Sequence, residues 1–183
     1  MKASVTKRGG GSSLTARWRG VKIFLCDVDG VLTDGTVIIG AENETKQFHI
    51  RDGLGLKFLQ RQGIRVGWIS NRISHATTRR AQELRIDFLE QLEGSKVKAA
   101  EKVLAQAQLG WEDACYAGDD VVDLGVMQRV GLAVAVADAI EEVKRQAHYT
   151  TAAPGGQGAV REVVEKILRA QKKWQPIVDS YQQ

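Results

Sequence analysis

Residues 21–33 read Val-Lys-Ile-Phe-Leu-Cys-Asp-Val-Asp-Gly-Val-Leu-Thr. The apolar run at 21–26 predicts a buried β-strand, which is followed directly by Asp27 and Asp29. Gly30 allows the chain to turn sharply after the two acids. Because two like charges held close together repel each other, a strand that presents both carboxylates to one cleft indicates a site that uses them.

Short apolar runs alternate with longer segments of helical period along the rest of the chain. This alternation predicts an α/β fold, a three-layer Rossmann-like parallel sheet with helices on both faces. We expect strands at 21–26, 65–69, 87–89, 114–117 and 131–136. We expect helices at 53–62, 73–85, 95–108, 120–129, 138–146 and 158–173. Asp52 and Ser95 are predicted to cap two of these helices, and Gly63 and Gly110 to follow their ends.

One segment interrupts the alternation. Residues 36–39 and 45–50 are rich in β-formers and flank a polar loop, which predicts a hairpin at 36–50 inserted directly after the acidic strand end. An isolated two-stranded hairpin is only marginally stable in water. We therefore expect this hairpin to cover the cleft or to meet another subunit.

Length and charge bound the domain organisation. A chain of 183 residues with 43% hydrophobic content is long enough for one well-buried domain. We expect a disordered basic, Gly/Ser-rich tail at 1–19, one domain at 20–173 and a C-terminal tail at 174–183. The first 20 residues hold five of the 26 basic residues and no acid, so the remainder has 21 basic and 22 acidic residues. The net charge of +4 thus reflects the tail, and the sequence gives no support for nucleic-acid binding.

The chain offers no apolar stretch typical of a signal peptide or a membrane span, so we expect no membrane partner. Cys26 and Cys115 each lie inside an apolar strand-like run. A thiol in that setting usually behaves as a small buried hydrophobe. Two free thiols indicate the cytoplasm rather than an oxidising compartment.

Polar residues recur where three predicted strands end, at the sheet edge where open α/β proteins bind ligands. The first strand ends with Asp27 and Asp29. In addition, Lys96 lies at the start of a predicted helix, where its positive charge opposes the helix dipole and indicates an anion nearby. The other strand ends carry Ser70, Asn71 and Arg72, and then Asp119, Asp120 and Asp123.

Each of these features also has a structural explanation. Strand-end acids often cap turns and helices, Ser70 and Asn71 suit an ordinary turn, Lys96 suits a solvated position, and Arg72 suits a structural salt bridge. The coincidence of all of them at one edge of one sheet favours a functional site.

The chemistry that needs this set is phosphoryl transfer to a carboxylate. Converging Asp side chains without His or Cys provide the hard oxygen ligands that Mg²⁺ prefers. Asp27 is suited to attack phosphorus, and Asp29 to donate a proton to the leaving group and later to take one from water. Lys96 and Ser70 are suited to hold phosphate oxygens.

These residues match, in order and spacing, the four motifs of the haloacid dehalogenase superfamily of phosphatases, and the similarity spans nearly all of 21–170. Three further segments resemble one family within it, the 3-deoxy-D-manno-octulosonate 8-phosphate (KDO 8-phosphate) phosphatases: 48–55 (FHIRDGLG), 134–139 (VAVADA) and 155–162 (GGQGAVRE). The second motif departs from the common Ser-Gly-Arg of this family, because Asn71 stands in place of Gly. Since Asn still supplies a backbone N–H, we expect phosphate binding to survive.

The resemblance implies a capless enzyme that uses Mg²⁺ to hydrolyse KDO 8-phosphate, in lipopolysaccharide synthesis, as a homotetramer assembled through the hairpins. It implies Asp27 as the nucleophile and Asp29 as the acid/base. Mg²⁺ would be held by Asp27, the Asp29 carbonyl and Asp119. The implied substrate or phosphate contacts are Thr33, Ser70, Asn71, Arg72 and Lys96, with Asp120 and Asp123 in support.

Three alternatives stay open at this point. The first is a phosphatase for another nonulosonate or sugar phosphate, although the guanidinium of Arg72 suits the carboxylate of a sugar acid. The second is a receiver-type signalling module, in which the phosphoacceptor Asp would stand at the end of a middle strand and not after the first strand. The third is a non-catalytic scaffold.

Overall fold

A parallel sheet with the strand order β5-β4-β1-β6-β7-β8 forms the centre of the computed structural model, which describes residues 13–40 and 44–182. The first strand in sequence, β1, lies in the middle of the sheet between β4 and β6. Its carboxyl end therefore opens onto the centre of one sheet edge. The six strands are β1 (Ile23–Cys26), β4 (Arg65–Ser70), β5 (Phe88–Gln91), β6 (Ala114–Gly118), β7 (Leu132–Ala135) and β8 (Tyr149–Thr150).

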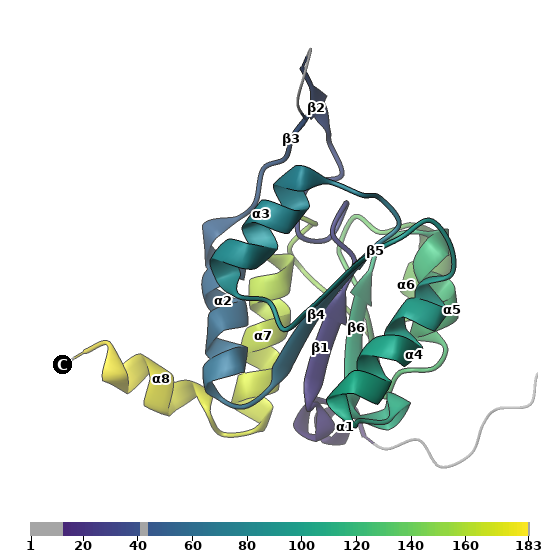
Figure 1. Ribbon diagram of the computed structural model, residues 1–183. Coiled ribbons are helices and arrows are strands. Elements are labelled where there is room, and N and C mark those ends of the chain that lie inside the picture. The colour runs from purple at the N-terminus through teal and green to yellow at the C-terminus, as the bar shows by residue number, and fades with distance from the viewer. Residues whose placement is uncertain (1–12, 41–43, 183) are drawn as a thin grey trace, which may run out of the picture.

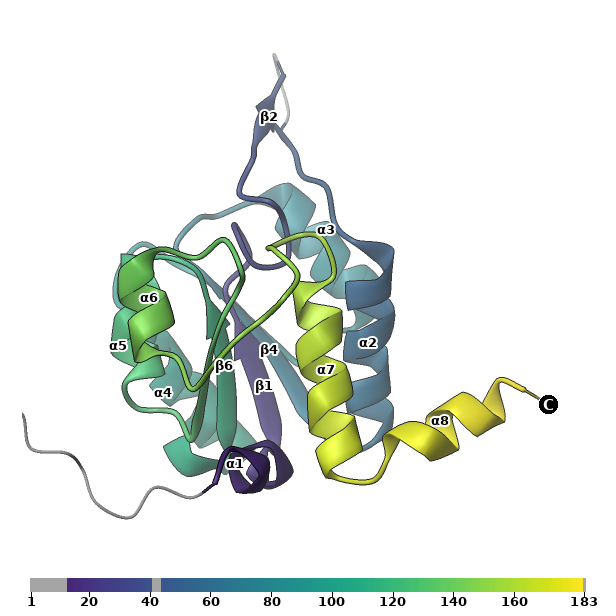
Figure 2. The same cartoon turned by 180° about the vertical axis from the view of Figure 1, so that it is seen from behind.

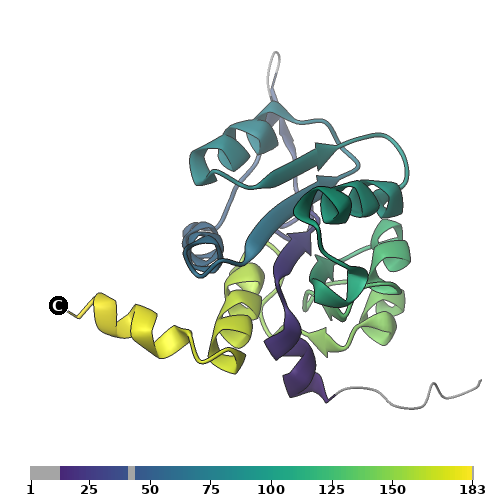
Figure 3. The ribbon, with the colours of Figure 1, turned by 60° about the horizontal axis from the view of Figure 1, so that its bottom comes forward.

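Helices cover both faces of the sheet, as the sequence predicted. Helices α2, α3 and α7 lie on one side and α4, α5 and α6 on the other (Figure 1), and the view from behind gives the same layers (Figure 2). The sheet also separates the two helical layers when the molecule is seen from its lower end (Figure 3). The bounds are α2 (Ile50–Arg61), α3 (His75–Leu84), α4 (Lys96–Ala107), α5 (Leu124–Met127), α6 (Glu141–Gln146) and α7 (Ala159–Ala170).

The central strands are apolar throughout because neither face meets water. All four residues of β1 and all four of β7 are buried. This burial on both faces is typical of a parallel sheet between two helical layers and explains why these segments read as continuous apolar runs. Cys26 and Cys115 are both buried free thiols, as predicted.

The inserted hairpin rises above the carboxyl edge of the sheet (Figure 1). Strands β2 (Ile38–Ile39) and β3 (Glu44–Thr45) pair antiparallel, and the predicted loop residues 41–43 lie outside the described residues. Ile38 and Ile39 are 55% and 78% exposed. In the chain that returns from the hairpin, Phe48 stacks on Trp68 of β4 with 6.2 Å between ring centroids, which anchors this segment to the domain.

Both predicted tails are in part helical. Residues 14–20 form α1 (Leu14–Gly20), where Trp18 is buried and contacts Tyr149 edge-on at 5.5 Å, while residues 1–12 lie outside the described part of the chain. The C-terminal segment forms α8 (Trp174–Ser180), whose Trp174 packs edge-on against Phe58 at 6.1 Å. Charge and Gly/Ser content predicted disorder in the first case, but a single buried tryptophan in each segment fixes it to the domain.

The structure departs from several local predictions. Asp52 does not cap α2: it is the third helical residue, and its carboxylate instead accepts the backbone N–H of Arg161 at 2.7 Å, which joins α2 to α7. The helix predicted at 120–129 is divided into a 3₁₀ turn, Val121–Asp123, and the short α5. Strand β8, two residues long, was not predicted, because so short an element has no detectable period.

None of the described helices is both long and apolar enough to cross a membrane.

Candidate active site

An open pocket of about 290 Å³ lies at the carboxyl ends of β1, β4 and β6. The structure brings together at this pocket most of the residues that the sequence singled out. Two predicted residues, Thr33 and Asp123, are fully buried and do not line it. Its lining consists of Asp27, Asp29, Gly35, Val37, Ser70, Asn71, Arg72, Lys96, Asp119, Asp120 and Val122.

Asp27 is held rigidly at the floor of the pocket. Its backbone N–H donates to the carbonyl of Ala117 at 3.0 Å, which continues the pairing of β1 with β6 beyond the strand end. Its Oδ1 accepts the N–H of Val28 at 2.6 Å, and its Oδ2 lies 2.6 Å from Nζ of Lys96. Both carboxylate oxygens are thus oriented, and only 6% of the residue is exposed.

Asp123 is the centre of the charge network beneath the pocket. Its Oδ1 accepts from Nζ of Lys96 at 2.7 Å and from the hydroxyl of Tyr116 at 2.6 Å. Its Oδ2 accepts the backbone N–H groups of Asp119 at 2.9 Å and Asp120 at 3.3 Å. A fully buried carboxylate with four donors is a structural anchor, and it places both Lys96 and the Asp119 backbone.

Burial and mutual repulsion make the pocket favourable to a cation. Burial, followed by the charge of Asp123, raises the pKa of Asp27 to about 6 despite Lys96. Burial, then Asp123 and Asp27, raises the pKa of Asp119 to about 8. Burial alone would lower the pKa of Lys96, but the carboxylates of Asp123 and Asp27 outweigh it and raise that pKa. One ammonium therefore does not neutralise the carboxylates, and a divalent ion would stabilise their ionised forms.

The donor set fits a hard divalent metal ion. Carboxylate oxygens of Asp27, Asp119 and Asp123 lie within 4.8 Å of one another, and Oδ1 of Asp119 is buried without a hydrogen-bond partner. Both oxygens of Asp123 are already committed to protein donors, which leaves Asp27 and Asp119 as the side chains with ligand capacity. An all-oxygen set of this kind suits Mg²⁺.

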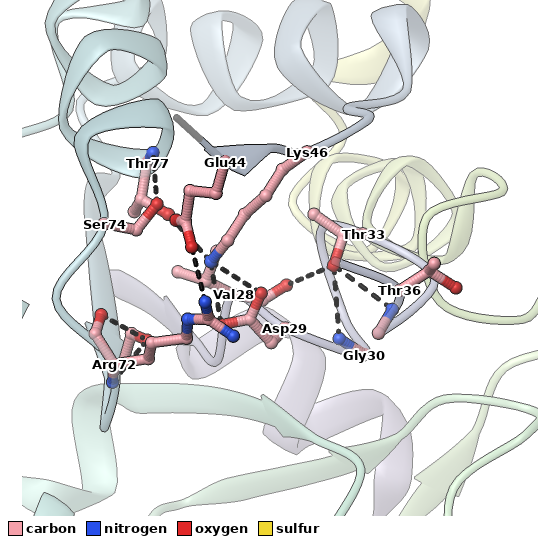
Figure 4. Close-up of polar contacts among 12 residues, drawn as sticks. Val28, Asp29, Gly30, Thr33, Thr36, Glu44, Lys46, Arg72, Ser74 and Thr77 are labelled. Atoms are coloured by element: carbon pink, nitrogen blue, oxygen red, sulfur yellow. Dashed lines mark hydrogen bonds and ion pairs between the residues drawn. The ribbon is translucent and has the colours of Figure 1, made fainter. Parts of the chain in front are cut away.

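Asp29 has its own lysine, which the sequence did not reveal. Nζ of Lys46, from the chain directly after β3, lies 2.7 Å from Oδ1 and 2.9 Å from Oδ2 of Asp29 (Figure 4). The two catalytic candidates are therefore paired separately, Asp27 with Lys96 and Asp29 with Lys46. No local signal identifies Lys46, because the hairpin brings it back from 17 positions away.

The second-motif residues form a compact turn above β4. Ser70 Oγ accepts the N–H of Arg72 at 3.1 Å, and the side-chain amide of Asn71 donates to the carbonyl of Gly94 at 2.8 Å. Arg72 forms a salt bridge with Glu44 of the hairpin (Figure 4). The salt bridge considered for Arg72 therefore exists, but its side chain remains 44% exposed at the pocket and keeps donors free for a ligand.

Thr33 does not fit its predicted role as a phosphate contact. Its hydroxyl accepts the N–H of Gly35 at 3.2 Å and that of Gly30 at 3.4 Å (Figure 4), so it closes the turn after Asp29. Gly30 adopts φ +86°, and a Cβ there would lie 2.2 Å from Oδ2 of Asp119. The turn therefore requires glycine for both its conformation and the space beside Asp119.

Comparison with known proteins agrees with this geometry. The family model for haloacid dehalogenase-like hydrolases matches residues 68–163. The KDO 8-phosphate phosphatase of Yersinia pestis is 43% identical over 154 residues, which are 84% of this chain and 82% of that protein. The chain belongs to the KDO 8-phosphate phosphatase family of haloacid dehalogenase-like hydrolases. It is thus a phosphoric monoester hydrolase, which excludes the receiver-type module.

Solved structures of this family share the fold closely. A crystal structure of the Yersinia pestis phosphatase matches with a TM-score of 0.87 at 41% identity and covers 88% of each chain. The KDO 8-phosphate phosphatase from Moraxella catarrhalis, in complex with magnesium ion, phosphate ion and KDO, matches with a TM-score of 0.89 at 35% identity. That alignment covers 91% of this chain and 97% of the other. The predicted fold class is therefore confirmed.

Proposed function

We propose that this enzyme hydrolyses KDO 8-phosphate to KDO and inorganic phosphate. The observation that carries the proposal is the pocket itself: a buried, lysine-paired Asp27 at its floor and an arginine, Arg72, at its rim. The first suits attack on a phosphoryl group, and the second suits the carboxylate of a sugar acid. The Moraxella relative, crystallised with KDO, phosphate and magnesium, supports the same substrate class.

In the first step, Oδ2 or Oδ1 of Asp27 attacks phosphorus in line, the bond from phosphorus to the sugar oxygen breaks, and an aspartyl-phosphate forms. Asp29, at the lip of the pocket with 24% of its side chain exposed, gives a proton to the departing sugar oxygen. In the second step it takes a proton from a water molecule that attacks phosphorus, the bond between phosphorus and the Asp27 oxygen breaks, and inorganic phosphate leaves. Lys96 remains beside Asp27 and stabilises the charge on the phosphoryl oxygens, with Ser70 and the backbone after it.

Mg²⁺ is the cofactor that fits this pocket, and the carboxylates of Asp27 and Asp119 and the backbone carbonyl of Asp29 would hold it. When bound, it supplies positive charge against which the phosphoryl group is positioned. Asp123 supports the site from below by anchoring Lys96 and the backbone of Asp119, and Asp120 caps the following 3₁₀ turn through Val121 N–H at 2.6 Å.

We place the enzyme in the cytoplasm, in agreement with its two buried free thiols, and in lipopolysaccharide synthesis, where KDO is used. We also propose a homotetramer assembled through the hairpins. The exposed isoleucines of β2 support association, since a short ribbon that exposes Ile38 and Ile39 gains stability when they are covered.

Release of phosphate from a panel of sugar-acid phosphates, with and without Mg²⁺, tests the proposal. We expect the highest kcat/KM for KDO 8-phosphate and no turnover after chelation of the metal. A clear preference for a nine-carbon sugar-acid phosphate would move the assignment to that substrate. A chain inert to the whole panel with metal present would be a scaffold.

A further inference from the structure

Lys46 is buried on a segment that is otherwise largely solvent-facing. Its side chain has no exposed surface, although the strand residues before it, Ile38, Ile39 and Thr45, are exposed. Lysine is almost never fully buried in proteins unless it is paired, so the position has a specific cause. That cause is the carboxylate of Asp29, which takes Nζ on both of its oxygens at 2.7 and 2.9 Å.

A third contact fixes Lys46 from the opposite side. Its Nζ also lies 3.3 Å from Oγ1 of Thr77, a fully buried residue of α3 (Figure 4). Nζ therefore donates hydrogen bonds to Oδ2 of Asp29 and to Oγ1 of Thr77, and it makes an ionic contact with Oδ1 of Asp29. The lysine joins three elements: the returning hairpin chain, the turn after β1, and helix α3.

From these contacts we infer that Lys46 is a positioning residue for Asp29: it holds the carboxylate in the one orientation from which a proton reaches the leaving sugar oxygen. The inference rests on the acid/base role proposed for Asp29. It also gives the hairpin a second purpose, because the insertion delivers a component of the active site within the same chain as well as a surface for association.

Lys46 is separate from the phosphate-binding part of the pocket. Lys96 serves Asp27 at 2.6 Å, whereas Lys46 contacts Asp29 alone among the pocket carboxylates in the described residues. Loss of Lys46 should therefore weaken the step that needs Asp29 and leave substrate binding nearly intact. A residue that only secured the hairpin would instead lower the rate with every substrate by the same factor.

The leaving group separates these two roles. The sugar alkoxide needs a proton as it departs, whereas p-nitrophenolate is stable near neutral pH and does not. The experiment measures single-turnover release of KDO from KDO 8-phosphate and of p-nitrophenol from p-nitrophenyl phosphate, with Mg²⁺. In Lys46→Met we expect KDO release to fall about 30- to 100-fold with KM within about 3-fold, and p-nitrophenol release to fall less than about 5-fold. Equal losses with both substrates, or no loss with either, would overturn the inference.

Three further comparisons make the result specific. Lys46→Arg, which keeps a cation beside Asp29, should restore the ratio of the two rates to within about 5-fold of the parent, and a ratio as low as that of the Met variant would count against positioning. In an Asp29→Asn background, Lys46→Met should remove no further KDO release, whereas an additional loss of about 10-fold would show an independent role. Lys102→Met, which removes a surface lysine paired with Glu90, is the matched control and should leave both rates unchanged.

The parent enzyme serves as the control for the proposed function. If it does not release KDO from KDO 8-phosphate, the substrate assignment fails whatever Lys46 does. The positioning role is then tested with the best alkyl phosphate found in the substrate panel, against p-nitrophenyl phosphate, by the same ratio.

Discussion

Replacing Asp123 with Asn is the most informative single change in this protein, because Asp123 is the buried anchor beneath the pocket. The substitution keeps the shape of the side chain but turns one oxygen into an NH₂ group. In one orientation this group faces the backbone N–H groups of Asp119 and Asp120, and in the other it faces Lys96 and Tyr116. Either way donor meets donor, and Lys96 loses one of its two carboxylates.

The magnitude follows from the burial of the group, which has no exposed surface. Removing one partner of a buried ion pair typically costs about 3–5 kcal/mol, because the remaining charge stays buried without compensation. For a domain of this size each kcal/mol shifts Tm by roughly 2–4 °C, so we expect Tm to fall by roughly 6–20 °C.

Calorimetry in EDTA measures this effect without the added stabilisation of bound metal. Asp120→Asn is the matched control: Asp120 is exposed, its side chain caps the following turn, and Asn caps equally well, so we expect a change within about 0.5 kcal/mol. A Tm for Asp123→Asn within about 2 °C of the parent would refute the view that this carboxylate organises the site.

Three further outcomes follow from the same geometry. Protons compete with the metal on Asp27, whose pKa is raised to about 6, and on Asp119, whose pKa is raised to about 8. The affinity for Mg²⁺, measured by calorimetric titration, should therefore rise about tenfold per pH unit between pH 6 and 8 and level off above pH 8. A flat profile would contradict this competition. The folded pKa of Asp119 lies above its unfolded value of 3.8, so ionisation costs the metal-free protein stability that is lost as pH rises from about 4 to about 8. At pH 8, Asp119→Asn should therefore raise the metal-free Tm by roughly 6–12 °C, which corresponds to about 3 kcal/mol once the pKa shift is halved for solvent screening. The same variant should abolish stabilisation by Mg²⁺, and a lower metal-free Tm would be inconsistent with charge repulsion. In Gly155→Ala, the new Cβ would lie 1.8 Å from the carbonyl oxygen of Gly30, so we expect denaturant unfolding to show a loss of about 2 kcal/mol in the free energy of unfolding. The control Gly20→Ala, where nothing lies near the new Cβ, should lose less than about 0.5 kcal/mol. Equal effects would mean that the contact at Gly155 relaxes freely.

The sheet and most of the pocket were predictable from sequence for one physical reason. Parallel strands buried on both faces read as apolar runs, and the polar residues that follow them must gather at one edge. Asp27, Ser70 and Asp119 could therefore be placed together without coordinates, and Lys96 could be added from its unfavourable position at a helix start.

The remaining contacts depend on how distant segments meet. Tyr116 lies inside an apolar strand, where nothing in the sequence marks it as polar in function, yet its hydroxyl donates to Asp123. Lys46 lies in a hairpin whose angle to the domain no local pattern specifies. Asp52 suited a helix cap, but packing of α2 against α7 gives its carboxylate a better donor in the Arg161 N–H. Tertiary contacts thus override local preference at each of these positions.

Detection of a phosphorylated Asp27 tests whether the enzyme works through an aspartyl-phosphate. Enzyme mixed with radiolabelled KDO 8-phosphate and Mg²⁺ is quenched in acid within one turnover, and the labelled peptide is identified. We expect label on the peptide that contains Asp27, released by hydroxylamine, and neither label nor turnover in Asp27→Asn, whose fold and assembly should stay intact. Substantial phosphate release by Asp27→Asn, or label on another residue, would contradict the mechanism.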